Sequence, residues 1–208
     1  MEILNREQRE ILVGCMLGDA RLECRSLNGT ARLRIHQADS QKSYLMWKYE
    51  KFRNLTLSCP RKSVCLDKRF GSQVVSWYFH TRTLGCLGKY FSMFYRNGRK
   101  IVPIEFEELL TPLALAVWIM DDGSLCREAL VINTQSFSDE DHEAIISCFR
   151  SRYEVEISLQ QDRRNKRIYF PKEATDQIVA KIFNYLINPE LIPVETDVPI
   201  TIGTEKGR

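Results

Sequence analysis

The amino-acid sequence predicts a mixed α+β fold built from two similar half-domains, each with the element order α-β-β-α-β-β-α. An apolar helical run that ends in aspartate and a small residue occurs twice, at residues 11–21 and 113–124. Strand-like and helical segments then follow each run in the same order. The period of about 100 residues is too long for a solenoid repeat and fits two similar units in one chain. We therefore expect one half-domain in residues 1–100 and the other in residues 101–208.

Both repeated runs are predicted to be buried helices. Asn5 is a plausible N-cap, and Gln8 stands three residues later, as in a capping box. Thr111 is a plausible N-cap for the second run, with Pro112 at the first helical position, where a missing N–H costs nothing. Because the runs are apolar nearly all round, we expect the two helices to pack against each other. Small residues such as Gly14 would allow their backbones to approach closely.

The remaining elements follow from alternating or helical spacing of apolar residues. The other predicted helices cover residues 40–52, 84–95, 138–153 and 174–186. The predicted strands cover residues 30–37, 63–68, 74–80, 129–135, 154–160 and 167–170. In the strand at 30–37 polar and apolar residues alternate, so Arg32, Arg34 and His36 are expected on one exposed face. The tryptophans are expected in the core.

Composition excludes several classes of protein. The chain has 208 residues, 44% of them hydrophobic, which is enough for a sizeable core. It contains no run of roughly 18 apolar residues that could span a membrane, and its N-terminus does not resemble a secretory signal. Seven cysteines without a Cys-x-x-Cys pair, and three histidines away from them, predict reduced thiols rather than a zinc site. We therefore expect an intracellular protein that is not secreted.

The distribution of charge indicates a nucleic-acid partner more clearly than the net charge of +3 does. Basic residues cluster at 21–34, 61–69, 96–100 and 163–167, whereas acidic residues gather at 105–108 and 139–143. The basic segments could form one positive face after folding. On charge alone, scattered and solvated side chains are an equally good interpretation.

Asp19 and Asp122 stand at the C-terminal ends of the two apolar helices. A carboxylate at this end opposes the helix dipole, at a cost of about 0.3–1 kcal/mol, and parallel packing would bring the two acids together. A divalent cation between them would reverse both effects, and Mg²⁺ binds one or two carboxylates together with waters and phosphate oxygens. Either aspartate alone could simply cap a turn, but two of them in a repeated context favour a metal site.

These two segments resemble the paired motifs of LAGLIDADG homing endonucleases. Residues 12–20 and 115–123 each align with the nine-residue motif without gaps. Asp19 and Asp122 then fall on the eighth position, the metal-binding acid, while Asp121 falls on the seventh and is not expected to be a ligand. The resemblance covers nearly the whole chain and is closest to the single-chain, intron-encoded mitochondrial members.

The resemblance implies an enzyme that cuts both strands of one long DNA site with Mg²⁺, for which Mn²⁺ can substitute. Asp19 and Asp122 would bind the metal, with Ala20 and Gly123 beside them as further metal-site positions. Bound metals lower the pKa of water and neutralise the phosphate during an in-line displacement.

Three further residues are candidates for the catalytic site. Lys100 lies in a segment that resembles one with an active-site lysine in related enzymes, and its ammonium could stabilise charge on the phosphate. A role as a basic loop residue is equally possible. Gln37 and Gln135 occupy matching places after the two motifs and could position water or phosphate, or could merely close a strand end.

In this family two antiparallel sheets form a saddle over the DNA major groove, so the two sheets should carry recognition. Side chains there either read bases or contact phosphates. The candidates are Arg21, Arg32, Arg34, His36, Arg61, Lys62, Lys68, Arg69, Arg127, Gln160, Arg163, Arg164, Lys166 and Arg167. The implied partner is double-stranded DNA, bound by a monomer with internal pseudo-two-fold symmetry, and no membrane. Because the halves differ in sequence, the DNA site should be asymmetric.

The sequence also departs from the family pattern. Ala20 stands where the motif usually has glycine, and Gly18 replaces a residue that is often alanine. Near the C-terminus, the segment at 191–199 resembles one that carries a lysine in related enzymes, but here it contains Asp197 and no lysine. Basic residues that the family pattern would place symmetrically in the two halves are therefore incomplete in the second half. The resemblance places the protein in an organelle, mitochondrion or chloroplast, or in a bacterial or archaeal cytoplasm.

Three other functions compete with this hypothesis. A maturase that binds its host intron RNA would share the fold, and retention of both aspartates does not exclude such a second role. A DNA-binding protein that has lost cleavage would fit the missing lysine. A metal hydrolase of small substrates would need a clustered His/Asp site, which three scattered histidines do not provide.

Overall fold

The computed structural model describes residues 3–24, 29–67, 71–162, 165–187 and 194–195. Four of the predicted DNA contacts, Lys68, Arg69, Arg163 and Arg164, lie outside the described residues. The segment that contains Asp197 also lies outside them, so the comparison with the lysine-bearing segment of the family stays a sequence observation.

The two halves of the chain repeat one order of elements. The first half contains α1 (Arg6–Leu17), β1 (Arg21–Glu23), β2 (Arg32–Ala38), α2 (Lys42–Phe52), β3 (Arg61–Asp67), β4 (Ser72–His80) and α3 (Gly85–Phe94). The second half contains α5 (Pro112–Asp122), β7 (Gly123–Cys126), β8 (Ala129–Asn133), α6 (Asp139–Tyr153), β9 (Ser158–Asp162), β10 (Asn165–Phe170) and α7 (Lys172–Ile182). Both therefore read α-β-β-α-β-β-α, which confirms the predicted fold class.

Shorter elements complete the described chain. A hairpin of β5 (Tyr95–Arg96) and β6 (Arg99–Lys100), followed by α4 (Phe106–Leu109), joins the halves. The strand β11 (Val194–Glu195) pairs in parallel with β7. Single 3-10 turns occur at Asp39–Gln41, Arg53–Leu55 and Phe183–Tyr185. The sequence patterns did not indicate these short elements.

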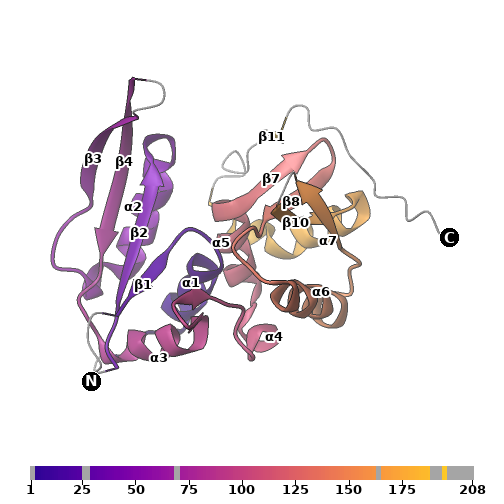
Figure 1. The fold of residues 1–208 in the computed structure, drawn as a ribbon, viewed down its shortest axis with the longest axis horizontal. Coiled ribbons are helices and arrows are strands. Elements are labelled where there is room, and N and C mark those ends of the chain that lie inside the picture. The colour runs from indigo at the N-terminus through magenta and orange to yellow at the C-terminus, as the bar shows by residue number, and fades with distance from the viewer. Residues whose placement is uncertain (1–2, 25–28, 68–70, 163–164, 188–193, 196–208) are drawn as a thin grey trace.

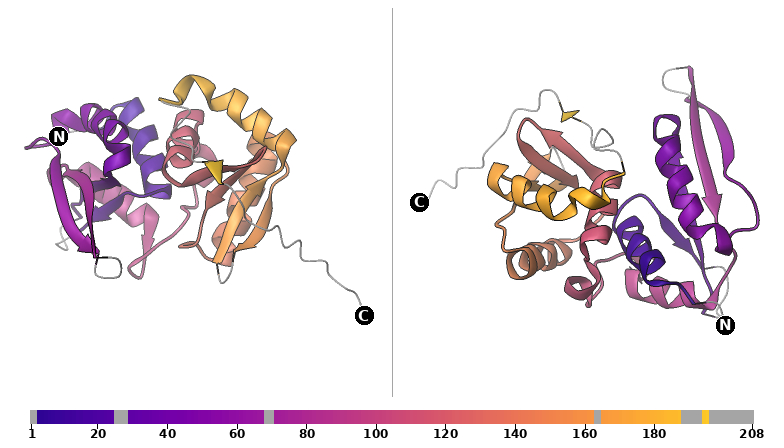
Figure 2. Two further views of the ribbon diagram at one scale, coloured as in Figure 1. Left: turned by 90° about the horizontal axis from the view of Figure 1, so that it is seen from above. Right: turned by 180° about the vertical axis from the view of Figure 1, so that it is seen from behind.

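The elements form two separate sheets on either side of a pair of central helices (Figure 1). One sheet has the strand order β1-β2-β4-β3, and the other has the order β11-β7-β8-β10-β9. The helices α1 and α5 pack against each other between the sheets. Seen from behind, α2 and α7 cover the same side of the two sheets, which leaves the opposite faces turned together toward one side of the molecule (Figure 2).

The central helices begin where the sequence predicts. The Asn5 side chain accepts from the Gln8 backbone N–H at 2.8 Å, and the Gln8 side chain accepts from the Asn5 N–H at 3.1 Å, which confirms the capping box. The Thr111 hydroxyl accepts from the Ala114 N–H, with proline at the first helical position, as expected. Nearly every residue of both helices from their second turn onward is buried, as the apolar patterning predicted.

Gly14 sets how closely the two helices approach. A Cβ atom at this position would lie 2.4 Å from the Ala114 carbonyl oxygen and 2.6 Å from the Val117 Cβ. Such contacts are far shorter than van der Waals separation, and both neighbours belong to the interior of α5. The glycine therefore permits the helix contact on which the position of both motif ends depends.

We expect Gly14→Ala to lower the free energy of unfolding by about 1–3 kcal/mol, because the overpacking strain exceeds the gain of about 1 kcal/mol in helix propensity. Denaturant unfolding would measure this change. Gly85→Ala is the matched control, because a Cβ at this helical glycine meets nothing within 4 Å. Equal stability of Gly14→Ala and the wild type would show that the helices can separate without cost.

One predicted strand is wrong at its start. The sequence predicts a strand from residue 154, but β9 begins at Ser158. Glu154 adopts a left-handed conformation with φ of 57° and caps the C-terminus of α6. The Val155 N–H then donates to the Phe149 carbonyl, so these residues close the helix rather than open the strand.

The core is continuous across the two halves and the helices between them. Trp118 is completely buried in it, while Trp47 and Trp77 pack against its edge, which confirms the prediction that the tryptophans serve packing. Among the described residues, no helix is long and apolar enough to cross a membrane.

Candidate active site

Three carboxylates, those of Asp19, Asp121 and Asp122, lie near the ends of the two central helices. Helix α1 ends at Leu17, two residues before Asp19, and α5 ends at Asp122, directly after Asp121. The three acids lie close enough that the Asp19 and Asp121 charges both raise the pKa of Asp122. The structure therefore brings the two predicted metal-binding positions together.

Burial and mutual repulsion work against ionisation of these acids. Burial is the largest cause that raises the pKa of Asp122 to about 8, followed by the charges of Asp19 and Asp121. Burial also raises the pKa of Asp19, although Lys48, Lys100 and a hydrogen bond from Gln37 act in the opposite direction. A site with this excess of negative charge favours a bound cation.

Lys100 reaches this cluster from the hairpin that joins the halves. Its Nζ donates to the Gly18 carbonyl oxygen at 2.8 Å and to the Ala20 carbonyl oxygen at 2.9 Å. Burial lowers the pKa of Lys100, while the charges of Asp122, Asp121 and Asp19 raise it. The ammonium of this candidate catalytic lysine thus packs against the turn that contains Asp19 and lies near all three carboxylates.

A buried ion pair supports the cluster from one side. Lys48 on α2 contacts Asp121 Oδ1 at 2.5 Å, and both side chains are 0% exposed. The sequence analysis did not identify this pair. The available signal was that Lys48 follows Tyr44 at a spacing of four residues, on the buried face of an otherwise amphipathic helix.

The two candidate glutamines are not equivalent. Gln37 on β2 is buried, its Nε2 donates to Asp121 Oδ1 at 3.1 Å, and its Oε1 has no hydrogen-bond partner. Gln135 is exposed in the turn after β8, and no hydrogen bond of its side chain occurs among the described residues. The structure therefore brings Gln37 to the carboxylates and leaves Gln135 outside them.

The donor set suits a cation that keeps waters or phosphate oxygens as ligands. Within the described ranges, no three His, Cys, Asp or Glu residues are grouped as a protein-only metal site would require. Two crowded carboxylates with a raised pKa match the smaller protein contribution that Mg²⁺ takes. The Ala20 carbonyl already accepts from Lys100, and the Gly123 N–H donates to the Ile119 carbonyl as the cap of α5.

The open face of the first sheet carries a cluster of arginines around one acid. Register places Arg21 opposite Arg34 and Glu23 opposite Arg32, so all four side chains share a face. Glu23 contacts Arg32 at 2.6 Å, Arg21 at 3.0 Å and Arg34 at 3.7 Å. His36, the next residue on this face, contacts the Ser76 hydroxyl at 2.7 Å.

Two of the predicted DNA contacts, Lys62 and Lys166, do not lie on the open faces of the sheets. In β3, Arg61 pairs with Tyr78 on the open face, whereas Lys62 pairs with Trp77 on the opposite face of the sheet. In β10, Arg167 pairs with Gln160 but is only 6% exposed, whereas the Lys166 Nζ contacts Asp139 at 2.6 Å. Adjacent basic residues in a strand therefore point to opposite sides, which the sequence clusters did not resolve.

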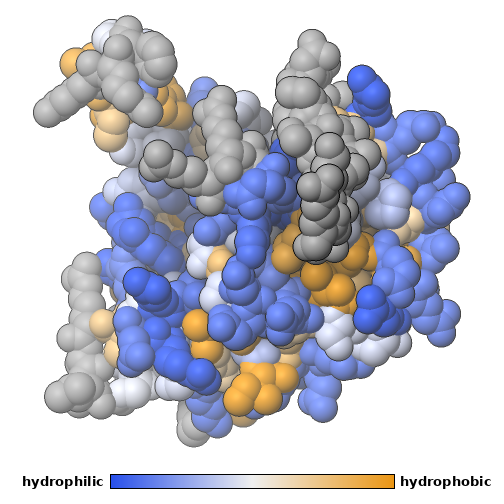
Figure 3. Space-filling view, turned by 45° about the vertical axis from the view of Figure 1, so that its right-hand side comes forward, coloured by the Kyte–Doolittle hydropathy of each residue, from blue (hydrophilic) through white to orange (hydrophobic). Residues whose placement is uncertain are grey.

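The open face of the second sheet is hollowed. A cavity of about 230 Å³ is lined by three predicted contacts, Arg127, Gln160 and Arg167, together with Tyr169 and Lys172. Most of the surface seen in Figure 3 is hydrophilic, with apolar residues in separate patches.

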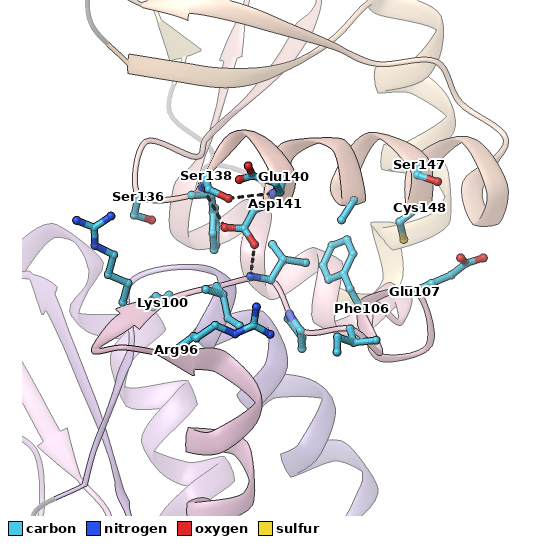
Figure 4. Close-up of a pocket in the computed structure, with 17 residues that line it drawn as sticks. Arg96, Lys100, Phe106, Glu107, Ser136, Ser138, Glu140, Asp141, Ser147 and Cys148 are labelled. Carbon is cyan, nitrogen blue, oxygen red and sulfur yellow. Dashed lines mark hydrogen bonds between the residues drawn. The ribbon is translucent and has the colours of Figure 1, made fainter.

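A larger cavity, of about 660 Å³, separates the joining segment from α6 (Figure 4). Arg96 and Lys100 line one wall, and Ser138 and Asp141 line the other. Asp141 Oδ1 accepts from the Val102 N–H at 2.8 Å, which ties the chain after Lys100 to the second half. The cavity lies beside the carboxylate cluster and does not contain it.

Comparisons with known proteins show which family this chain belongs to. The chain matches the model of the LAGLIDADG DNA endonuclease family over residues 9–178. It is 30% identical to the DNA endonuclease I-ChuI of Chlamydomonas applanata over 206 residues, which covers 91% of this chain and 92% of that protein. It is 26% identical to the cytochrome b mRNA maturase bI2 of Debaryomyces hansenii, across 88% of this chain and 72% of that protein.

A solved structure shares the fold. The homing endonuclease I-WcaI bound to its DNA recognition sequence superposes with a TM-score of 0.85 at 24% identity. The superposition covers 92% of this chain and 86% of that one, so both halves and both sheets have counterparts.

Proposed function

Because the chain belongs to the LAGLIDADG DNA endonuclease family, we propose that it is a homing endonuclease that cuts both strands of one long, asymmetric DNA site. The observation that carries this proposal is the meeting of Asp19 and Asp122 at the ends of α1 and α5, with Lys100 beside them. Burial and the charges of Asp19 and Asp121 raise the pKa of Asp122, and a bound cation would offset this cost.

We assign the metal-binding role to Asp19 and Asp122, one from each half. Mg²⁺ bound there, or Mn²⁺ in its place, would lower the pKa of a water and neutralise the scissile phosphates. The two carboxylates would bind and orient the cation, with Ala20 and Gly123 directly after them in the chain. The crowding of the two acids supports this assignment.

The surrounding residues supply a positive charge and a hydrogen-bond acceptor. Lys100 is already held by two carbonyl oxygens, so its ammonium can stabilise charge on the phosphate without first losing conformational freedom. The unpartnered Oε1 of Gln37 can accept a hydrogen bond from the attacking water. We do not extend this role to Gln135, whose side chain is exposed in the turn after β8.

The open faces of the two sheets would bind double-stranded DNA, with the monomer supplying both halves of the saddle. The proposed DNA contacts on the first sheet are Arg21, Arg32, Arg34, His36 and Arg61. Those on the second sheet are Arg127 and Gln160, where the predicted contact Arg167 lines the same cavity but is buried. The strand register places Lys62 on the opposite face of its sheet, and the Lys166 ammonium contacts Asp139. Both lysines are therefore better suited to the flanks of the sheets than to their open faces.

Three hydrogen bonds support a boundary between the half-domains near residue 100. Lys100 donates to the Gly18 and Ala20 carbonyls of the first half, whereas the Val102 N–H donates to Asp141 of the second. Location inside the cell, in an organelle or in a bacterial or archaeal cytoplasm, stays a prediction.

Cleavage of a randomised double-stranded DNA library with Mg²⁺ tests the proposed function. Recovery of one long, asymmetric site, cut on both strands, is the expected result. A folded protein that selects a DNA sequence from the library but cuts none of it would contradict the endonuclease assignment.

We expect Arg34→Ala to weaken binding of the selected site about tenfold, because the open face loses one of its cationic side chains. If Arg34 contacts a phosphate, the slope of log K against log salt should fall by about 0.9. Arg53→Ala is the control, since Arg53 lies at the end of α2 and contacts Glu50 in the same turn. Equal affinity and equal slope in both variants would remove Arg34 from the DNA interface.

The similarity to a protein named as an mRNA maturase favours a second candidate function, binding of intron RNA. This activity is compatible with cleavage and does not require the carboxylates. Filter binding of the transcribed intron that carries the gene, compared with an unrelated RNA of equal length, would test it. Equal affinity for both RNAs would exclude a maturase role.

A further inference from the structure

Lys48 and Asp121 form an ion pair in a place where apolar residues would serve stability as well. Both side chains are 0% exposed, and Nζ lies 2.5 Å from Oδ1. Removing two charges from water is costly, and well-packed apolar replacements of such pairs are often neutral or stabilising. Stability alone therefore does not account for this pair.

The pair connects the first half of the chain to the last turn of the second-half helix. Lys48 belongs to α2, and Gln37 of β2 donates to the same Asp121 oxygen at 3.1 Å. The Lys48 Nζ lies 4.0 Å from the centroid of the Tyr44 ring, and the Tyr44 hydroxyl donates to the Val117 carbonyl at 3.2 Å. Three side chains of one half thus hold the C-terminal half of α5.

The arrangement exists on one side only. Gly18 precedes Asp19 as Asp121 precedes Asp122, but glycine offers no side chain to hold. A Cβ at Gly18 would lie 2.5 Å from the Asp121 Cβ and 2.7 Å from its Oδ2. The first motif therefore makes room for Asp121, and the anchor acts on the second motif alone.

We propose that Lys48 is a positioning residue for DNA cleavage: by holding Asp121, it fixes the adjacent Asp122 beside Asp19. The proposal rests on the endonuclease function above and deepens its account of the site. Lys48 is buried behind the cluster and does not contact the DNA. Its effect reaches the reaction through the backbone that joins Asp121 to Asp122, whose carboxylate would otherwise move away from that of Asp19 under their mutual repulsion.

The double substitution Lys48→Met/Asp121→Asn separates positioning from stability. It removes both buried charges together, so we expect an unfolding midpoint close to that of the wild type, whereas Lys48→Met alone leaves Asp121 unpaired and lowers the midpoint. Lys51→Met is the matched control, because Lys51 lies on the same helix and pairs with Glu7 at the surface.

Two measurements test the proposal, both well below each variant's unfolding midpoint. The first is the single-turnover rate on the selected DNA at saturating Mg²⁺, and the second is Mn²⁺ binding to the complex with an uncleavable phosphorothioate DNA, followed by the electron paramagnetic resonance of free Mn²⁺. For the double variant we expect unchanged DNA affinity, Mn²⁺ affinity lowered about 10–100-fold, and a rate lowered about 100-fold. Lys51→Met should match the wild type in both.

A double variant that folds, cleaves within about twofold of the wild type and binds Mn²⁺ as tightly would overturn the proposal while the endonuclease function stands. Failure of the wild type itself to cut any DNA would instead overturn the function. Should the double variant unfold, Lys48→Arg keeps the charge but places a wider head group in the buried site. Wild-type rate and Mn²⁺ affinity in Lys48→Arg would then count against positioning, and loss of both would support it.

Discussion

Asp122→Asn is expected to abolish cleavage of both strands and, at the same time, to stabilise the metal-free protein at pH 8. Cleavage would be lost because Asp122 is the metal-binding carboxylate that we propose for the second half, and an amide is a poor ligand for a hard cation. We expect a fall in the cleavage rate of about 1,000-fold or more, which leaves no measurable product.

The gain in stability follows from the pKa of Asp122. Its pKa of about 8 in the folded protein lies above the ordinary aspartate value of 3.8, so the folded protein binds more protons than the unfolded chain between these limits. The folded state is therefore favoured at low pH, and stability falls as pH rises from about 4 toward 8. Asparagine does not ionise and avoids this loss, so the variant should be more stable than the wild type at pH 8 by several kcal/mol, since each pKa unit corresponds to about 1.4 kcal/mol.

Thermal unfolding at pH 5 and pH 8, with and without Mg²⁺, measures this effect beside the cleavage assay. The difference between variant and wild type should be small at pH 5, large at pH 8 without metal, and reduced when Mg²⁺ offsets the repulsion in the wild type. Asp176→Asn, an exposed acid on α7, is the control and should change neither property. Retention of double-strand cleavage by Asp122→Asn would remove Asp122 from the metal site.

Lys100→Met should lower the single-turnover cleavage rate about 100–1,000-fold, with little change in DNA affinity. The ammonium lies beside the three carboxylates and next to the expected phosphate position, where a fixed positive charge stabilises the transition state more than the ground state. Methionine has a similar length, so the packing of the joining hairpin is retained.

The measured quantities are the rate at saturating protein and Mg²⁺ and the affinity without metal. Because Lys100 also donates to the Gly18 and Ala20 carbonyls, a modest loss of stability is expected, and assays belong well below the unfolding midpoint. Lys89→Met, on the exposed face of α3, serves as the control. A rate within about threefold of the wild type would show that Lys100 has a structural role only.

The fold, and the placement of Asp19 and Asp122 at neighbouring helix ends, could be predicted because their signals are local. The capping box at Asn5 and the Thr111–Pro112 start appear in consecutive residues, and the apolar helices end abruptly at their aspartates. The repeat of this pattern then implies that the two ends meet. Glu154, whose left-handed conformation closes α6, shows the limit of such signals, since nothing in its sequence neighbourhood indicates the conformation.

The rest of the site depends on contacts between distant segments. Lys48 and Asp121 are 73 residues apart, and only the assembled halves bring them within 2.5 Å. Lys62 could not be assigned to a face because β3 shows no regular alternation of buried and exposed residues, so only its pairing with β4 sets the phase. Lys166 was included because basic residues surround it in the sequence, whereas Asp139, which it contacts, lies 27 residues away.

The contrast between Gly18 and Asp121 also limits how such a chain could be divided. If the first half assembled with a copy of itself about the same helix contact, two glycines would face each other and each Lys48 would be buried without a counter-ion. If the second half did so, the two Asp121 carboxylates would face each other without any lysine. Because an unpaired buried charge is strongly destabilising, neither half can serve as the subunit of a stable homodimer. The complementary charges thus make each half an obligate partner of the other, and they commit the protein to a single chain or to a strict heterodimer of its halves.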